Sequence, residues 1–250
     1  MKPRLLDLFC GAGGAAIGYH RAGFDVVGVD INPQPNYPFK MTKCDAMIAM
    51  HRLLHEEWLA TRFGRIQLSD FSAIHASPPC QHFTRYGNVV KDIKDRYDDF
   101  LGPTRDLLNE TGLPWVIENV EGSPLIEPVM LCGSMFAECH DLRRHRLFET
   151  NWGLNLGLLP QCNHGSWEKN RYPGGRWKAR KENDSSITPS SPIRNTIEVG
   201  RWNIKLEKQK WAMGVDWKMT LRELSESIPP SYTHWVGEHL LAHVRETASA

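Results

Sequence analysis

The chain has 250 residues, of which 41% are hydrophobic and 24% are charged, and its formal net charge is +1. This length and apolar content suffice for one doubly wound domain with a sizeable core and a small appendage. The sequence contains no run of eighteen apolar residues, and Met1-Lys2-Pro3-Arg4 leads directly into a predicted strand, so we expect a soluble, intracellular protein without a signal peptide.

The N-terminal half alternates predicted strands and helices. The apolar run Leu5–Phe9 predicts a strand, and a glycine-rich loop separates it from a helix over Ala15–Ala22 that Gly23 ends. The valine-rich run Phe24–Asp30 is typical of a strand in the middle of a parallel sheet. This order gives a βαβ unit and predicts an α/β fold with a Rossmann-like, doubly wound, mostly parallel sheet.

The alternation continues with a helix, a strand, a helix and a strand, predicted over Ile48–Phe63, Phe71–Ala76, Pro103–Leu108 and Trp115–Val120. Reactive and polar side chains recur where these strands end. Cys80 lies in the loop after one strand, and Glu118 and Asn119 end another. Because open α/β sheets bind ligands at the carboxyl ends of their strands, a functional site is expected at this edge of the sheet.

The glycine loop, Gly11-x-Gly13, is followed about twenty residues later by Asp30. This spacing fits a nicotinamide dinucleotide as well as an adenosyl cofactor, because both need close backbone approach and an acid on a ribose hydroxyl. Phe9 before the loop, and Asp45 beyond a short third strand, favour the adenosyl cofactor, since Asp45 could accept from an adenine amino group. Asp45 could alternatively only cap the helix that follows.

Cys80 lies in a loop that two prolines stiffen, Pro78-Pro79-Cys80-Gln81. Such a loop holds a thiol in one place, and a nearby helix N-terminus or exposed amides could lower its pKa, which is the usual requirement for a nucleophilic cysteine. Gln81 and Arg85 follow on a loop that could close over a substrate, although an ordinary βα loop also explains them.

Three ordered motifs, Asp7-Leu8-Phe9-Cys10-Gly11-Ala12-Gly13-Gly14, Pro78-Pro79-Cys80-Gln81 and Glu118-Asn119-Val120, resemble those of the DNA cytosine-5 methyltransferases. The resemblance runs from Leu5 to about Phe148 and returns near the C-terminus. It implies a compact phage or bacterial enzyme that methylates carbon 5 of cytosine in DNA, in the cytoplasm of a bacterial cell or of a phage-infected host. It also implies the S-adenosylmethionine-dependent methyltransferase fold.

The resemblance implies S-adenosyl-L-methionine as cofactor. Phe9, Gly11 and Gly13 correspond to the methionine and adenine side, Asp30 to the ribose and Asp45 to the adenine. The remaining cofactor residues expected from the motifs are Gly14, Ile31 and Pro79.

The resemblance also implies the catalytic groups. Cys80 adds to carbon 6 of a flipped-out cytosine, and Glu118 donates to ring nitrogen 3 with a pKa that burial should raise. Leu142-Arg143-Arg144-His145-Arg146 resembles the family's Gln-x-Arg-x-Arg element, with Leu142 where glutamine is usual, so Arg144 and Arg146 are expected to hold the cytosine carbonyl and support the nucleophile loop. The residues expected on the substrate are Gln81, Arg85 and Asn119.

Basic charge is concentrated between His140 and Trp211, where fourteen Lys or Arg face seven Asp or Glu among several tryptophans. Cations interleaved with aromatic side chains suit phosphate neutralisation and base stacking, although a solvated basic loop is the simpler alternative. We expect double-stranded DNA as partner, no membrane and no obligate protein partner.

We divide the chain into a catalytic and cofactor-binding domain (1–150), a small basic target-recognition region (151–211) and C-terminal helices that pack back on the catalytic domain (212–250). The two C-terminal helices are predicted over Thr220–Ile228 and Ser231–Val244, with Pro229-Pro230 between them. So short a recognition region can read only a short site, on the order of two to four base pairs.

The six cysteines show no paired Cys-x-x-Cys spacing, so reduced thiols are expected. Cys132, Cys139-His140 and Cys162-x-His164 could in principle gather around zinc, but these spacings match no standard zinc knuckle. The sequence therefore predicts buried or loop cysteines and no metal site. Two other functions stay open, namely the same chemistry on RNA and a non-catalytic nucleic-acid-binding relative.

Overall fold

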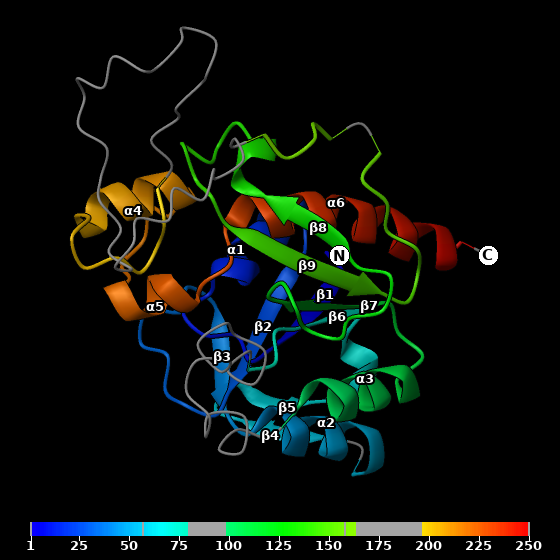
Figure 1. Cartoon of the computed structure of the whole chain (residues 1–250). Coiled ribbons are helices and arrows are strands. Elements are labelled where there is room, and N and C mark those ends of the chain that lie inside the picture. The colour runs from blue at the N-terminus through cyan, green and yellow to red at the C-terminus, as the bar shows by residue number, and fades with distance from the viewer. Residues whose placement is uncertain (1, 57, 80–98, 158, 164–196, 250) are drawn as a thin grey trace, which may run out of the picture.

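The computed structural model describes residues 2–56, 58–79, 99–157, 159–163 and 197–249. Its centre is a seven-stranded sheet in the order β3-β2-β1-β6-β7-β9-β8 (Figure 1). The strands are β1 (Arg4–Leu8), β2 (Asp25–Asp30), β3 (Lys40–Lys43), β6 (Ala73–Ala76), β7 (Trp115–Asn119), β8 (Val129–Cys132) and β9 (His145–Thr150). Neighbouring strands from β3 to β7 are parallel, whereas β9 is antiparallel to both β7 and β8. The predicted α/β fold with a doubly wound, mostly parallel sheet is confirmed.

The described helices are α1 (Gly14–Ala22), α2 (Ala46–His55), α3 (Leu101–Glu110), α4 (Leu206–Met213), α5 (Leu221–Glu226) and α6 (Pro230–Thr247). Gly23 ends α1 in the left-handed region at φ 118°, as its position in the sequence predicts. Thr220 caps α5, because its hydroxyl accepts from Glu223 N while the Glu223 side chain accepts from Thr220 N. None of the helices in the described part of the chain is both long and apolar enough to cross a membrane.

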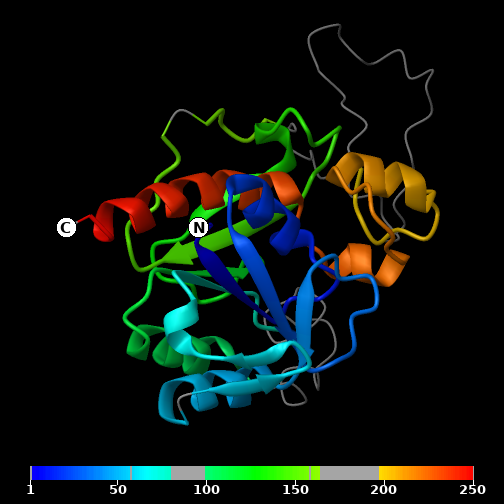
Figure 2. The same ribbon diagram turned by 180° about the vertical axis from the view of Figure 1, so that it is seen from behind.

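Helices cover the two faces of the sheet. Figures 1 and 2 show α1 and α6 together on one face and α2 and α3 on the other. Side chains of a strand alternate between these layers, as the pleat requires. Leu5 of β1 packs in the cluster that contains α1 and α6, whereas Leu6 and Leu8 pack in the cluster beneath α2. The sheet is therefore buried on both sides, which explains its continuous apolar runs.

Helix α6 lies in close contact with α1, the helix that follows the glycine loop. Thr233 Oγ1 donates to Ala15 O at 2.9 Å. Gly18 of α1 is buried at the crossing, where an added Cβ atom would lie 2.0 Å from Thr233 Oγ1 and 2.3 Å from Pro230 O. The last helix of the chain is thus joined to the first βα unit by contacts that leave no room for a methyl group.

The predicted helix over Ile48–Phe63 is wrong in its second half. Helix α2 ends at His55, and the antiparallel pair β4 (Leu59–Thr61) and β5 (Gly64–Ile66) follows. The turn between these strands places Gly64 at φ 114°, and Thr61 Oγ1 donates to Gly64 O at 2.7 Å. A glycine with positive φ and a side chain that bonds the turn backbone oppose a continuous helix.

Candidate active site

Four parallel strands end at the same edge of the sheet. The glycine loop follows β1, Asp30 ends β2, Ser77 and Pro78 follow β6, and Asn119 ends β7 (Figure 1). This convergence is the physical consequence of parallel pairing, and it places the predicted cofactor residues and the predicted acid at the same edge of the sheet.

The backbone of the glycine loop has an unusual conformation. Phe9 has φ 57°, in the left-handed region that a bulky side chain seldom adopts. Gly11 follows at φ 48°, and an added Cβ atom there would meet no atom within 4 Å. At Gly13, by contrast, an added Cβ would lie 2.5 Å from Pro38 Cδ. Strain at Phe9 and open space at Gly11 are features of a loop shaped to meet a ligand.

Asp30 binds the backbone of the glycine loop through its carboxylate. Its Oδ2 accepts from Gly11 N at 3.0 Å and its Oδ1 accepts from Asn32 N at 2.8 Å. The next residue, Ile31, is 58% exposed although it is large and apolar. Each carboxylate oxygen of Asp30 retains a second acceptor site, so the pair fits a ribose diol beside an adenine ring and the residues present suit an adenosyl cofactor.

Asp45 acts as the N-cap of α2. Its Oδ1 accepts from Met47 N at 2.8 Å and from Ile48 N at 3.1 Å. The capping alternative drawn from the sequence thus describes its local role, and neither of these bonds uses Oδ2. A contact of Asp45 with adenine stays a prediction.

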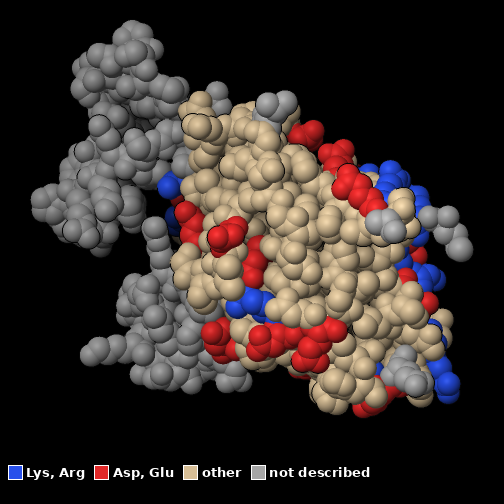
Figure 3. Space-filling view, turned by 90° about the vertical axis from the view of Figure 1, so that its right-hand side faces the viewer, with Lys and Arg blue, Asp and Glu red and all other residues tan. Residues whose placement is uncertain are grey.

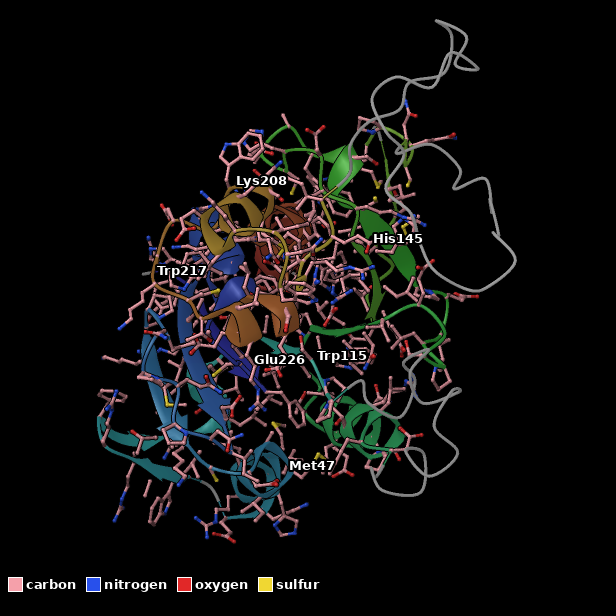
Figure 4. All side chains as sticks on the ribbon, turned by 60° about the vertical axis from the view of Figure 1, so that its left-hand side comes forward. Met47, Trp115, His145, Lys208, Trp217 and Glu226 are labelled. Atoms are coloured by element: carbon pink, nitrogen blue, oxygen red, sulfur yellow. The ribbon has the colours of Figure 1, made fainter. Side chains whose placement is uncertain are left out.

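Trp217 was not predicted at this site. Its indole Nε1 donates to Ala12 O, a carbonyl of the glycine loop, at 3.1 Å. Figure 4 shows Trp217 in the segment between α4 and α5, beside α1. Only the fold brings these residues together, because they lie 205 positions apart in the chain.

Glu118 is buried at the carboxyl end of β7. Burial raises the pKa of its carboxyl group, whereas the charge of Arg146, a hydrogen bond from Ser77 and the charge of Arg144 act in the opposite direction. Arg146 Nε lies 2.9 Å from Glu118 Oε1 as an ion pair without the directional geometry of a hydrogen bond. A buried carboxyl group with a raised pKa, held beside a cation, suits a proton donor that works near neutral pH.

A chain of hydrogen-bonded polar groups leads through the protein to Glu118. Tyr19 Oη lies 2.9 Å from His75 Nδ1, and His75 Nε2 lies 2.8 Å from Ser77 Oγ, which in turn bonds Glu118. Burial lowers the pKa of His75 to about 3, so its ring is neutral, with one nitrogen donating and the other accepting. We did not predict His75 or Ser77. The only signal in the sequence is their place just before Pro78-Pro79-Cys80.

Asn119 is buried and bonds the loop that leads to Cys80. Its Nδ2 donates to Pro78 O at 3.1 Å, and its Oδ1 accepts from Val120 N at 2.8 Å. Asn119 therefore positions the backbone just ahead of Cys80, and its contact with substrate stays a prediction. Pro79 is half-buried, and Cys80, Gln81 and Arg85 lie outside the described residues.

The two predicted arginines bond different partners. Arg146 of β9 faces Glu118, and its Nη1 donates to His145 O at 2.7 Å. Arg144 Nη2 instead donates to the carbonyls of Ser225 and Ser227, at 2.6 and 2.8 Å. Arg144 thus ties the residue before β9 to the C-terminal end of α5, and Arg146 is the better placed of the two to act on a bound base.

Asp7, on β1 below the glycine loop, makes stability depend on pH. Its side chain is buried, and burial raises its pKa from 3.8 to about 8 against a hydrogen bond from Tyr37 Oη at 3.2 Å. The folded state therefore holds a proton that the unfolded chain has lost, so this stabilisation is present at acidic pH and disappears as the pH rises toward 8. We expect a slope of at most about 1.4 kcal/mol per pH unit.

The measurement is urea unfolding at several pH values from 5 to 8.5. The free energy of unfolding of the wild type should fall as the pH rises, and Asp7→Asn should make this fall shallower, because the amide does not titrate. Equal slopes in the two proteins would contradict a protonated Asp7.

Known proteins resemble this chain in sequence and in fold. The family model for C-5 cytosine-specific DNA methylase matches residues 3–123. The chain is 33% identical over 98 residues to Type II methyltransferase M.XorII of Xanthomonas oryzae pv. oryzae, a match covering 36% of this chain and 22% of that protein. It is 31% identical over 147 residues to the tRNA (cytosine(38)-C(5))-methyltransferase of Schizosaccharomyces pombe, covering 54% and 41%. The matches thus span less than half the length of either relative.

Among solved structures, an E. coli protein described as a prophage-encoded DNA modification methyltransferase has a TM-score of 0.53 to this chain at 15% identity. The superposition covers 98% of this chain and 99% of that one. At this identity the likeness shows the fold, and it extends that fold beyond the segment that the family model matches.

Proposed function

Because residues 3–123 match the family model for C-5 cytosine-specific DNA methylase, we propose that this chain methylates carbon 5 of cytosine in DNA, with S-adenosylmethionine as methyl donor. The observation that carries the proposal is Glu118, buried beside Arg146 at the sheet edge that also presents Asp30 and the glycine loop. This edge combines an acid for the cytosine ring with an acceptor pair for a ribose.

Each residue of the site has a distinct task in this reaction. Cytosine carbon 5 is a poor nucleophile, and addition of the Cys80 thiolate to carbon 6 makes it enamine-like. Glu118 donates its proton to ring nitrogen 3 and accepts from the exocyclic amine, a pair of contacts that selects cytosine over thymine or uracil. Arg146 supports the carboxyl group and reaches toward the carbonyl of the base. Bound S-adenosylmethionine supplies the electrophilic methyl group. Release of Cys80 then restores the aromatic ring, with the carbon-5 proton passing to a base or water.

The target base lies inside a stack in duplex DNA, so it must be flipped out to reach Cys80. Gln81 and Arg85 follow the nucleophile and are the side chains proposed to contact the displaced nucleotide. The basic segment between His140 and Trp211 is proposed to neutralise phosphates, and residues 151–211 to read the target. The face in Figure 3 carries many Asp and Glu side chains across its middle, with Lys and Arg mainly at one margin, so it suits phosphate poorly.

The same chemistry on RNA is the second candidate. The S. pombe relative acts on tRNA by its name, and it matches a longer segment of this chain than M.XorII does. We favour DNA because the matched family model describes a DNA methylase. Transfer of a tritiated methyl group to duplex DNA and to tRNA, assayed in parallel, separates the two.

The proposal is tested by trapping the protein on duplex DNA that contains 5-fluorocytosine, in the presence of S-adenosylmethionine. Fluorine cannot leave as a cation, so the complex formed after methyl transfer stays covalently attached through Cys80. A denaturant-resistant adduct is expected for the wild type but not for Cys80→Ser. No adduct on any cytosine-containing DNA, from protein shown to be folded and to bind the cofactor, would overturn the proposal for DNA.

DNA affinity should fall steeply as the salt concentration rises, because bound Lys and Arg side chains release counterions. If about four phosphates are neutralised, the dissociation constant should rise on the order of a hundredfold between roughly 50 and 200 mM salt. Fluorescence anisotropy with a labelled duplex measures this slope. A flat response would count against the basic segment as the DNA-binding face.

A further inference from the structure

Two cysteines and one histidine, residue types that commonly bind metals, lie close together at the start of β9. Cys132 is the last residue of β8, and His145 is the first residue of β9 and its direct partner across the antiparallel pair. Cys162, in the segment that follows β9, completes the group. Figure 4 shows His145 on β9, next to β8. Cys132 is buried and the other two are half-buried.

The ligand atoms of these three side chains are close enough together to bind one metal ion after a small contraction. Their ligand atoms all lie within 4.8 Å of one another, and Cys162 Sγ is 3.4 Å from His145 Nε2. In a tetrahedral zinc site, metal–ligand bonds of about 2.3 Å to sulfur and 2.0–2.1 Å to nitrogen place sulfur and nitrogen about 3.6 Å apart and two sulfurs about 3.8 Å apart. A sulfur–nitrogen pair at the 4.8 Å limit would therefore need to contract by about 1.2 Å, and Cys162 Sγ and His145 Nε2 are already close enough.

The surroundings of the group resemble the outer shell of a zinc site. Histidine ligands usually give their second ring nitrogen to a carboxylate, which fixes the ring and raises its basicity. His145 Nδ1 lies 3.0 Å from Glu121 Oε2, which leaves Nε2 on the side of Cys162. Ser134 Oγ donates to Cys132 Sγ at 3.4 Å and accepts from Asn163 N at 2.9 Å, so it joins the chain beside both sulfurs.

We propose that Cys132, His145 and Cys162 bind a zinc ion, with a fourth ligand completing the tetrahedron. Two sulfurs and one imidazole form a donor set that zinc prefers over magnesium or calcium, which take oxygen. The proposal replaces the expectation of no metal site. It also differs from the grouping weighed from the sequence, because Cys139 Sγ lies 3.0 Å from Ser231 Oγ and His140 stacks on Trp211.

The proposed ion would have a structural role. It would fasten the chain at Cys162 to the β8–β9 pair, one residue away from Arg146 and its ion pair with Glu118. The segment that leaves Cys162 leads into the most basic stretch of the sequence. Zinc would thus fix the entry to that stretch relative to the catalytic edge. The inference does not depend on the substrate, so it can fail while the proposed methylation stands.

Zinc content of the purified full-length protein tests the proposal. The chain is produced in zinc-supplemented medium, passed through a desalting column and analysed by plasma mass spectrometry. About one zinc ion per chain is expected for the wild type. Cys162→Ser should lose most of it, whereas Cys44→Ser, which removes an equally half-buried cysteine outside the group, should keep it. Cys162 is preferred to Cys132 because substitution of the buried Cys132 could unfold the chain.

The wild type alone can also decide the question. Cobalt bound in place of zinc should show thiolate-to-metal charge-transfer absorption, and X-ray absorption should report two sulfur neighbours and at least one nitrogen. A wild type that neither retains zinc nor binds added zinc or cobalt, or a Cys162→Ser protein with the zinc content of Cys44→Ser, would overturn the site. A disulfide between Cys132 and Cys162, found by peptide mass mapping of the protein as purified, would overturn it as well.

Discussion

Glu118→Gln is expected to lower kcat for methyl transfer by a factor of about 10² to 10⁴, with little change in KM. The amide has nearly the same shape as the acid and can still accept from the exocyclic amine of cytosine. It cannot deliver a proton to ring nitrogen 3, so the ring is not activated for attack by Cys80. Initial rates of tritium transfer to DNA, at saturating cofactor and over a range of DNA concentrations, give kcat and KM separately.

The pH profile adds a readout that a purely structural role for Glu118 would not affect. Because Glu118 acts in its protonated form, kcat of the wild type should decline as the pH rises above the raised pKa of this carboxyl group. The residual activity of Glu118→Gln should lack that decline, since its amide does not titrate.

The chain offers a matched control in Glu149, a second buried carboxylate paired with an arginine. It lies on β9 opposite Ile117, and its oxygens accept from Arg105 Nε and Nη2 at 2.6 and 2.7 Å. Glu149→Gln should lower stability by roughly 3 kcal/mol, because it leaves a partly buried arginine without its charge partner. Folded Glu149→Gln protein should nevertheless keep a kcat within a few fold of the wild type. A Glu118→Gln enzyme as active as Glu149→Gln would remove Glu118 from the mechanism.

The sequence predicts the architecture well where local signals agree with the fold. The valine-rich strand β2 and the glycine that ends α1 are recognisable because periodicity, propensity and capping act within a few residues. Strands β8 and β9 were not predicted, because β9 forms by pairing with β7, and β8 by pairing with β9, and no local pattern records these contacts. The hairpin of β4 and β5 was missed because the apolar spacing over Ile48–Phe63 also fits a helix, although α2 ends at His55 and β4 begins at Leu59.

The site likewise contains residues that the sequence predicts and residues that only the fold brings together. Asp30 and Glu118 could be placed at one edge because strand ends meet in any parallel sheet. Ser77 and His75 could not be predicted as site residues. They contribute through a hydrogen-bonded chain that begins at Tyr19, 56 positions before His75 in the sequence. The grouping of Cys132 with His145 likewise needs the register of β8 against β9. Strand ends can be predicted from the sequence, whereas lateral contacts between distant segments require the fold.

Gly18→Ala should destabilise the protein by roughly 3 kcal/mol, a large effect for one methyl group. Alanine normally favours a helix over glycine by up to about 1 kcal/mol, so α1 on its own would gain. At the crossing with α6, however, the new Cβ would lie 2.3 Å from Pro230 O and 2.6 Å from His234 N. These are backbone atoms of a long helix, which cannot rotate away as a side chain can, so the two helices must separate and lose packing.

Urea unfolding monitored by tryptophan fluorescence measures this loss, and Gly102→Ala in α3 is the matched control. An added Cβ at Gly102 would meet no atom within 4 Å. The gain in helix propensity there is opposed by Pro103, which disfavours the helical conformation in a preceding residue with a Cβ atom, so a change within about 1 kcal/mol is expected. If Gly18→Ala proved as stable as Gly102→Ala, α6 would not be packed on α1 as closely as described. Because α1 begins at the glycine loop, a separation of these helices should also weaken cofactor binding, which isothermal calorimetry with S-adenosylmethionine would detect.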